Sequence, residues 1–365
     1  MDTMQETWRS RYEESQMFTT DGLAAAKRNG KWGFVNRNGK EICQFKYDSV
    51  LPFIGGEALV QVGKFWGAMS TSGKEIVPVY YDEIFYFHDG LAKVKKDGKF
   101  GYVNRKGALA IPLMYENGEN FSSLTASVTL GGKAGIINTK GKVIIPFEYD
   151  EAASFSGGIA AVKRDDLWGF INKKNELVIP YQYEGVDWNF DGVAKVKSQG
   201  FWGIITNEGK EVVPPLYDDV LPFESGYAPV EKNGKWGMVN AQGTPICEAI
   251  YDDIYQFDKK GILAAVCRDD KWGYINTEGA EVIPTEYDEV GEFVNGFAAV
   301  CKNDLWGFVN REGKVVFALE YDEVEDFQDE KFALAAKDEE VFVLFSDGRV
   351  VPYKEIQENN YESEN

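Results

Sequence analysis

The stretch KWGFVNRNGK occupies residues 31–40, and nearly the same ten residues return at 271–280 as KWGYINTEGA. A catalytic motif needs to occur once in a chain, whereas a structural motif occurs wherever the structure repeats. Trp-Gly pairs recur every 34 residues, apart from one spacing of 36. They begin at Trp32, Trp66, Trp168, Trp202, Trp236, Trp272 and Trp306, with Phe100 and Ala134 in the two remaining places. With a degenerate last unit at Val341, the chain contains ten repeats between about residues 18 and 353.

Comparison of the repeats with one another shows which positions the architecture restricts. Alanine stands eight residues before the Trp position in all ten repeats, which predicts a crowded contact over its methyl group. The alanines are Ala24, Ala58, Ala92, Ala126, Ala160, Ala194, Ala228, Ala264, Ala298 and Ala333. A tyrosine followed by Asp or Glu stands fifteen residues after the Trp position, at Tyr47, Tyr81, Tyr115, Tyr149, Tyr183, Tyr217, Tyr251, Tyr287 and Tyr321. A phenylalanine follows six residues later, except after Tyr183.

Each repeat reads as four short antiparallel strands. The segment LAAAKR leads into Asn29-Gly30, a strong hairpin signal because both residues tolerate positive φ. The Trp-Gly strand follows, then EICQF at 41–45, then an extended stretch through Tyr47 towards Phe53. Neighbouring apolar residues after the Trp-Gly pair indicate a central strand covered on both faces. We expect its glycine to mark a close approach, and prolines such as Pro78 to mark a sheet edge or strand end.

We expect the Trp-Gly pairs to act as packing devices, each tryptophan burying on the order of 200 Å² against a stacked neighbour. The motifs resemble the WG-repeat (KWG-repeat) family of bacterial proteins, whose units read KWGFIDxxGKxVIPxxYDxxxxFxxGLAxV. The resemblance covers nearly the whole chain and is weakest at Phe100, Ala134 and Val341, where the Trp is lost. It implies a β-repeat architecture and supplies no catalytic residues.

The sequence therefore predicts an all-β fold in which ten repeats stack into an open superhelical or solenoid-like array. Ten units exceed the four to eight blades typical of propellers, and a ring or propeller-like closure is the alternative. Residues 1–17 are expected to form a capping helix, because 3–6 resemble a capping box and Met4, Trp8 and Tyr12 form a helical stripe. The array spans 18–353, and the acidic tail 354–365 is expected to be disordered.

Composition excludes several classes of function. The formal charge of −20 makes nucleic acid and anionic membranes poor partners. The single histidine, His88, has no partner for nucleophilic catalysis, and no phosphate-binding loop is present. The recurring Tyr-Asp pair could build a calcium ladder, but local turn structure is the favoured interpretation. We expect no enzyme activity, cofactor or metal, a cytoplasmic location because no secretory signal or membrane span is recognisable, and reduced thiols at Cys43, Cys247, Cys267 and Cys301.

Candidate contact residues come from positions that vary between repeats. Tyr86 and Trp188 stand five residues after a repeat tyrosine, where other repeats carry smaller or polar residues. Exposed aromatics are typical binding anchors, although Trp188 could equally be a displaced core residue. The favoured function is a protein-interaction or scaffold module with an unidentified protein partner. A glycan- or cell-wall-binding module is the alternative, because aromatic rings can stack on sugars.

Overall fold

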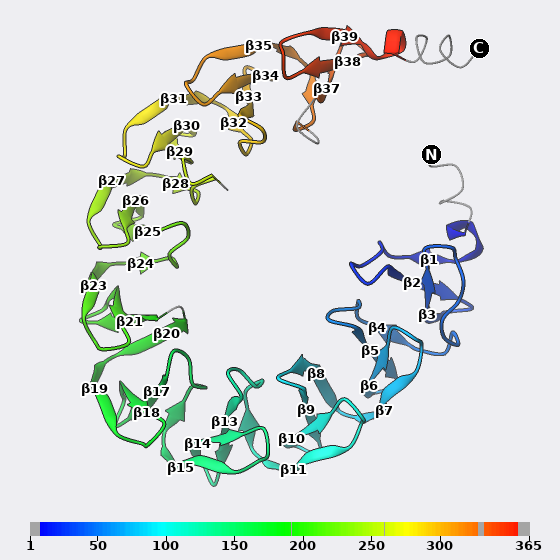
Figure 1. Ribbon diagram of the computed structural model, residues 1–365, viewed down its shortest axis with the longest axis vertical. Helices are drawn as coiled ribbons and strands as arrows, with labels where there is room; N and C mark the ends of the chain where they lie inside the picture. Colours follow the sequence, from blue (N-terminus) through cyan, green and yellow to red (C-terminus); the bar gives the residue numbers. More distant parts are fainter. Residues whose placement is uncertain (1–7, 191, 259, 328–331, 357–365) are drawn as a thin grey trace. The chain divides into compact units, whose positions relative to one another are not determined.

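The computed structural model covers residues 1–365 and describes residues 8–190, 192–258, 260–327 and 332–356; the side chains of 188–190 are outside this description. The described residues form ten antiparallel sheets, nine with four strands and one with three. Figure 1 shows the sheets succeeding one another in chain order. None is closed into a barrel, and the predicted all-β class built from ten repeats of short antiparallel strands is confirmed. No described helix is long and apolar enough to cross a membrane.

The chain divides into two compact units. The first contains residues 1–194 with 207–209, and the second contains 195–206 with 210–365. The strands up to 194 are β1 (Glu14–Ser15), β2 (Leu23–Arg28), β3 (Lys31–Asn36), β4 (Ser49–Val50), β5 (Glu57–Val62), β6 (Phe65–Ser70), β7 (Glu75–Tyr81), β8 (Glu83–His88), β9 (Leu91–Lys96), β10 (Lys99–Asn104), β11 (Leu109–Tyr115), β12 (Asn117–Gly118), β13 (Thr125–Leu130), β14 (Lys133–Asn138), β15 (Val143–Tyr149), β16 (Glu151–Ala152), β17 (Ile159–Arg164), β18 (Leu167–Asn172), β19 (Leu177–Tyr183) and β20 (Gly185–Phe190).

The remaining strands follow the same order. They are β21 (Val193–Ser198), β22 (Phe201–Thr206), β23 (Glu211–Tyr217), β24 (Asp219–Val220), β25 (Tyr227–Lys232), β26 (Lys235–Asn240), β27 (Pro245–Tyr251), β28 (Asp253–Ile254), β29 (Leu263–Arg268), β30 (Lys271–Asn276), β31 (Glu281–Tyr287), β32 (Glu289–Val290), β33 (Phe297–Lys302), β34 (Leu305–Asn310), β35 (Val315–Tyr321), β36 (Glu323–Val324), β37 (Phe332–Lys337), β38 (Glu340–Phe345) and β39 (Val350–Pro352). The two compact units therefore carry the same kind of sheet.

The second sheet, β4-β5-β6-β7, represents the repeat. Its first strand, β4, follows Tyr47 and pairs with β5 of the next hairpin, so a sheet runs from just after one repeat tyrosine to the next. Two expected boundaries were wrong: the tyrosine ends the last strand of its sheet, and the stretch after it opens the following sheet. The reason is the hydrogen bond from Asp48 N to Gln61 O, which commits this stretch to the later hairpin.

The Trp-Gly strand is central, as predicted. β6 lies between β5 and β7, and Gly67, Ala68 and Met69 are buried. A Cβ on Gly67 would lie 2.6 Å from the carbonyl oxygen of Val77, so the bulged neighbouring strand excludes any side chain there. Pro78 lies within β7, the edge strand, where no ladder hydrogen bond is lost.

The restricted alanines lie where consecutive sheets stack. All ten are at most 1% exposed. One cluster joins Phe34 and Tyr47 of the first sheet to Phe53 and Ala58 of the second, and a tyrosine, a phenylalanine and the alanine meet in the same way in later clusters of each unit. The predicted crowding over the alanine methyl is confirmed, and bulky aromatic side chains provide it.

The repeat tryptophans pack against the core clusters without being fully buried, as at Trp32, Trp66 and Trp272. All seven are only half-buried, whereas eight of the nine repeat tyrosines are at most 6% exposed. Each tryptophan stands opposite the fifth residue of the preceding strand, as in the pairs Trp66 with Gln61 and Trp168 with Lys163. The buried positions of this strand are those that follow the tryptophan, such as Gly67 and Ala68 after Trp66.

The start of the chain differs from the expected helix. Arg9–Arg11 form a short 3-10 helix, and Glu14–Ser15 then pair with β2, because the open edge of β2 accepts backbone hydrogen bonds there. Trp8 is 2% exposed and packs on Ala24, so the segment does cover the first hairpin. The capping box at 3–6 and the tail from 357 onward lie outside the described residues. Residues 353–356 form a helical turn.

Candidate functional site

The carboxylate after each repeat tyrosine binds a hairpin turn. Asp48 accepts a hydrogen bond from the backbone N of Gly63 at 2.7 Å, in the β5–β6 turn of its own sheet. Its other oxygen pairs with Lys31, which precedes Trp32 in the sheet before. The turn contact recurs at Asp82, Glu116, Asp150, Asp218, Asp252, Asp288 and Asp322. The interpretation of the Tyr-Asp pair as turn structure is confirmed at these positions.

These contacts stabilise the ionised carboxylates. The hydrogen bond from Lys133, followed by that from the backbone N of Asp165, lowers the pKa of Asp150. Where Phe65 replaces the lysine, the backbone N of Asp97 is the largest cause of the lowered pKa of Asp82. The pKa is also lowered at Asp48, Glu116, Asp252 and Asp288. The carboxylates are therefore held in their ionised form by hydrogen bonds and lysines within the fold.

Two kinds of side chain escaped the sequence reasoning. Asn36 accepts hydrogen bonds from the backbone N of residues 38 and 40, both at 3.0 Å, and the equivalent asparagines of five other repeats do the same. Asn310 accepts from the backbone N of Lys314. The recurrence of this asparagine four residues after the Trp position could have revealed it. Arg105 reaches back to the buried carboxylate of Glu57 at 2.7 Å. The residue type at this position varies between repeats, so no sequence pattern predicted that contact.

Tyr86 makes a contact between consecutive sheets. It is half-buried, and its hydroxyl donates to the carbonyl oxygen of Pro52 at 2.7 Å. Tyr86 and Trp188 lie in β8 and β20. Each of these strands is the first in its sheet and has six residues, whereas the first strands of the other described sheets are shorter. An aromatic residue at this position therefore accompanies a longer edge strand. The side chain of Trp188 lies outside the described residues. The partner-contact role of both residues stays a prediction.

The reactive side chains are dispersed. His88 ends β8 and is exposed. All four cysteines are free thiols, and burial raises the pKa of each. A raised thiol pKa disfavours the nucleophilic thiolate. Within the described residues, no group of three or more His, Cys, Asp or Glu side chains could hold a metal ion.

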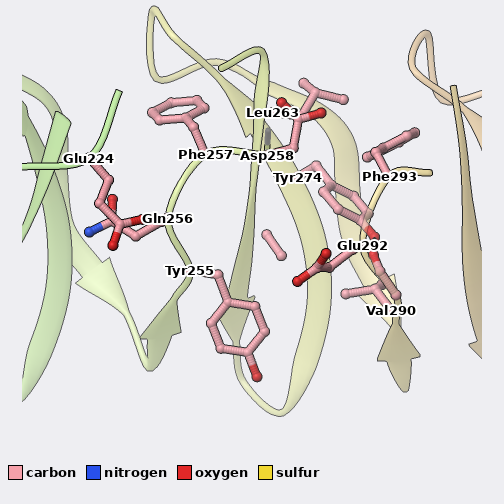
Figure 2. A pocket seen from close by; sticks show the side chains of 12 residues that line it. Glu224, Tyr255, Gln256, Phe257, Asp258, Leu263, Tyr274, Val290, Glu292 and Phe293 are labelled. Atoms are coloured by element: carbon pink, nitrogen blue, oxygen red, sulfur yellow. Dashed lines mark hydrogen bonds between the residues drawn. The ribbon is translucent and has the colours of Figure 1, made fainter. Parts of the chain in front are cut away.

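A pocket of about 380 Å³ opens between sheets of the second unit, around the loops that follow β28 and β32 (Figure 2). Its inner wall is aromatic: Tyr274 is 2% exposed, and its ring lies 4.9 Å from that of Phe293. The Tyr274 hydroxyl donates to the carbonyl oxygen of Gly291 at 2.5 Å, which fixes the loop after β32. At the opening, Tyr255 is 53% exposed, and its ring lies tilted at 5.0 Å from that of Trp272. The pocket thus joins a rigid apolar interior to an accessible aromatic ring.

The charged groups of this pocket are acidic. Asp258 pairs with Arg311, whose guanidinium lies 4.8 Å over the ring of Phe293. Glu292 is exposed, and within the described part of the chain no basic group pairs with it. Burial raises the pKa of the neighbouring Asp326, and the negative charge of Glu292 raises it further. The pocket therefore carries uncompensated negative charge beside an aromatic ring.

The fold defines an all-β repeat protein in which one sheet recurs along the chain. The family described as WG containing repeat matches at residues 10–32, 32–64, 66–100, 100–133, 135–168, 168–200, 202–236, 236–272, 272–306 and 306–339. The chain belongs to the WG-repeat family. A comparison with curated proteins finds no match.

Several solved structures match this chain at low identity and low TM-score. A eukaryotic initiation factor is 12% identical with a TM-score of 0.43, over 82% of this chain and 96% of the other. Hsv2 of Kluyveromyces lactis is 12% identical with a TM-score of 0.28, over 65% and 96%. PorZ, a surface component of the type-IX secretion system of Porphyromonas gingivalis, is 8% identical with a TM-score of 0.31, over 94% and 59%. These low values transfer no function to this chain.

Proposed function

We propose that this repeat protein is a non-catalytic module that binds other proteins, in the cytoplasm. One observation carries the proposal. The residue just before the repeat tyrosine is a large exposed apolar side chain in two consecutive sheets of each unit: Tyr80 and Met114 in the first, and Leu216 and Ile250 in the second, each 42–55% exposed. Other repeats carry charged or amide residues at this position. Adjacent exposed apolar residues are characteristic of protein-interaction surfaces.

The edge strands favour contact through side chains over strand addition. Pro78 and Pro112 lie in β7 and β11, beside Tyr80 and Met114, and proline offers no N–H to an added strand. A partner would therefore cover the apolar side chains without extending the sheet. This arrangement also protects the exposed edges from pairing with a second copy.

Site-specific photo-crosslinking in the native cell tests this role. We expect a photoreactive phenylalanine analogue at Tyr80 or Leu216 to yield discrete protein adducts. The matched controls are Glu148 and Glu286, exposed residues at the same repeat position, which should yield few. Equal adduct formation at all four positions would contradict a specific surface.

The alternative, a glycan-binding module, is supported by the partial exposure of the repeat tryptophans. Trp66 lines a shallow groove with Leu51 and Ile84, and a half-exposed indole can stack on a sugar ring. A glycan array with purified protein discriminates between the two roles. Saturable binding to polysaccharide or muropeptide, lost on substitution of Trp66, would replace the protein-binding proposal.

A further inference from the structure

The pocket around the loops after β28 and β32 has the chemistry of a receptor for a flat organic cation. We propose that it binds an arginine side chain presented by a partner protein, an inference that rests on the protein-binding role proposed above. The groups that would recognise arginine are the exposed ring of Tyr255 and the carboxylate of Glu292. Figure 2 shows this carboxylate directed into the space beside the ring.

The shape of the pocket suits a side chain with an apolar stem and a charged end. The interior surface comes from Leu263, Ala265 and Phe293, all of which are at most 9% exposed. A volume of about 380 Å³ is at the small end of ligand sites, as expected for one side chain rather than a cofactor. The methylene stem of arginine would lie on this surface while its guanidinium stays at the acidic opening.

The charge of the pocket favours a cation. Glu224, Asp258 and Glu292 line it, and no described lining residue is basic. Arg311 pairs with Asp258, but Glu224 and Glu292 have no ion pair within the described residues. The negative charge of Asp326 adds to that of Glu292 from the other side of the same loop, where Asp326 shares a second groove with Gly291. A bound cation would relieve this repulsion.

The chain itself holds arginine in this way at several places, and Arg105 and Arg311 are two of them. Arg105 lies 4.8 Å over the ring of Phe87 and pairs with Glu57 at 2.7 Å. Arg311 lies at the same distance over Phe293 and pairs with Asp258. Both arrangements combine an aromatic face with a carboxylate, which suits the planar guanidinium better than the compact ammonium of lysine. At the pocket opening, Tyr255 and Glu292 offer the same two groups.

Titration of the full-length protein with N-acetyl-arginine methylamide, followed by NMR, tests the inference. The reporter is the side-chain amide of Gln256, which lines the pocket and donates to Pro222 O at 3.2 Å. We expect saturable shifts of this signal, and no saturation with the uncharged citrulline analogue. Substituting Glu292→Gln should weaken the affinity about tenfold, the usual scale for losing one charged hydrogen-bond acceptor.

The matched control is Glu278→Gln, which removes the same charge from an exposed turn of the β30–β31 hairpin outside the pocket. It should leave the affinity within about twofold of the unmodified protein. Equal losses in the two variants, or equal binding of citrulline, would overturn the arginine site. If the arginine site is overturned but crosslinked adducts still form at Tyr80, the protein-binding role remains intact. If arginine binds but no adducts form, only the protein-binding role is contradicted.

Discussion

The methyl group of Ala160 lies in a layer shared by two sheets. Tyr149 ends the sheet β12–β15, and Phe155 precedes the strand β17 that carries Ala160; all three side chains are at most 2% exposed. No space remains for a longer side chain at this position, because protein interiors are packed to crystal-like density. The invariance of alanine in ten repeats thus has a steric cause.

Substituting Ala160→Leu should lower the free energy of unfolding by about 1–3 kcal/mol, the usual cost of extra methylenes in a filled core. Hydrogen exchange should accelerate first in the sheets β12–β15 and β16–β19, because repeat stability is a sum of local and nearest-neighbour terms. Hydrogen exchange resolved by peptide measures both effects. Uniform loosening of the whole chain would contradict a local contact.

The control for this experiment is Lys174→Ala, an exposed side chain in the β18–β19 turn, which should change the free energy of unfolding by at most about 0.5 kcal/mol. Asp165, in the neighbouring hairpin turn, is unsuitable as a neutral control. Its φ is 51°, so alanine there would add backbone strain of its own.

At the scale of elements, the turn between the third and fourth strands joins one sheet to the sheet before it. Gly243 in the β26–β27 turn has φ 74°, and a Cβ there would overlap the carbonyl oxygen of Val212 in β23. The equivalent Gly73 and Gly107 lie in the same way against the carbonyl oxygens of Ile42 and Ile76. Glycine is required here by conformation and by space together.

A comparison of Gly243→Ala with Gly234→Ala separates the two requirements. Gly234 has a similar φ of 72°, but no atom lies within 4 Å of its added Cβ. Gly234→Ala should therefore cost only the left-handed strain of about 1–2 kcal/mol. Gly243→Ala should cost about 1–3 kcal/mol more, because the sheets must move apart. Urea unfolding of both variants measures the difference, and equal midpoints would show that the close approach contributes nothing.

The sequence predicted those elements whose physical cause recurs in each repeat. Asn29-Gly30 forms the expected hairpin turn with φ of 53° and 70°, and the Trp-Gly strand is central because its glycine meets the bulged neighbouring strand. Which sheet the stretch after Tyr47 joins depends on a hydrogen bond to a residue of the next hairpin, which spacing alone does not reveal. The half-buried state of Trp66 was missed because the recurrence of a residue shows that its position is restricted, but does not show how deeply its side chain is buried.

The candidate pocket was the least predictable feature. Glu292 occupies the position five residues after a repeat tyrosine, which varies between repeats, but its neighbour Tyr255 follows no repeat pattern. Their proximity to Tyr274 arises only when the loops after β28 and β32 meet across stacked sheets. A site built from exceptions to a repeat leaves little signal in a comparison of the repeats with one another.

At the scale of the whole molecule, two electrostatic effects oppose each other as pH falls. The formal charge of −20 at pH 7 repels itself, and protonating carboxylates relieves that repulsion. The carboxylates after the repeat tyrosines act in the other direction. Their pKa is lowered in the folded chain by turn N–H groups and lysines, as at Asp48, Asp150 and Asp288.

The sign of the second effect follows from linkage. A carboxyl whose pKa is lower in the folded chain than in the unfolded chain stabilises the fold above the unfolded pKa, which is about 4. That stabilisation is lost as pH falls through the folded pKa. We therefore expect the thermal midpoint to hold or rise from pH 7 to about pH 5, and to fall steeply below about pH 4. Circular dichroism melting curves at intervals between pH 7 and pH 2 measure this.

Repeating the melts in 1 M NaCl identifies the cause of the acid loss. Salt at this concentration screens the net positive charge that the chain acquires at low pH, because the Debye length falls to about 3 Å. It does not replace the short hydrogen bonds from Gly63 to Asp48 or from Asp165 to Asp150. The fall below about pH 4 should therefore persist in high salt. If it disappears there, self-repulsion and not the loss of the turn contacts unfolds the protein in acid.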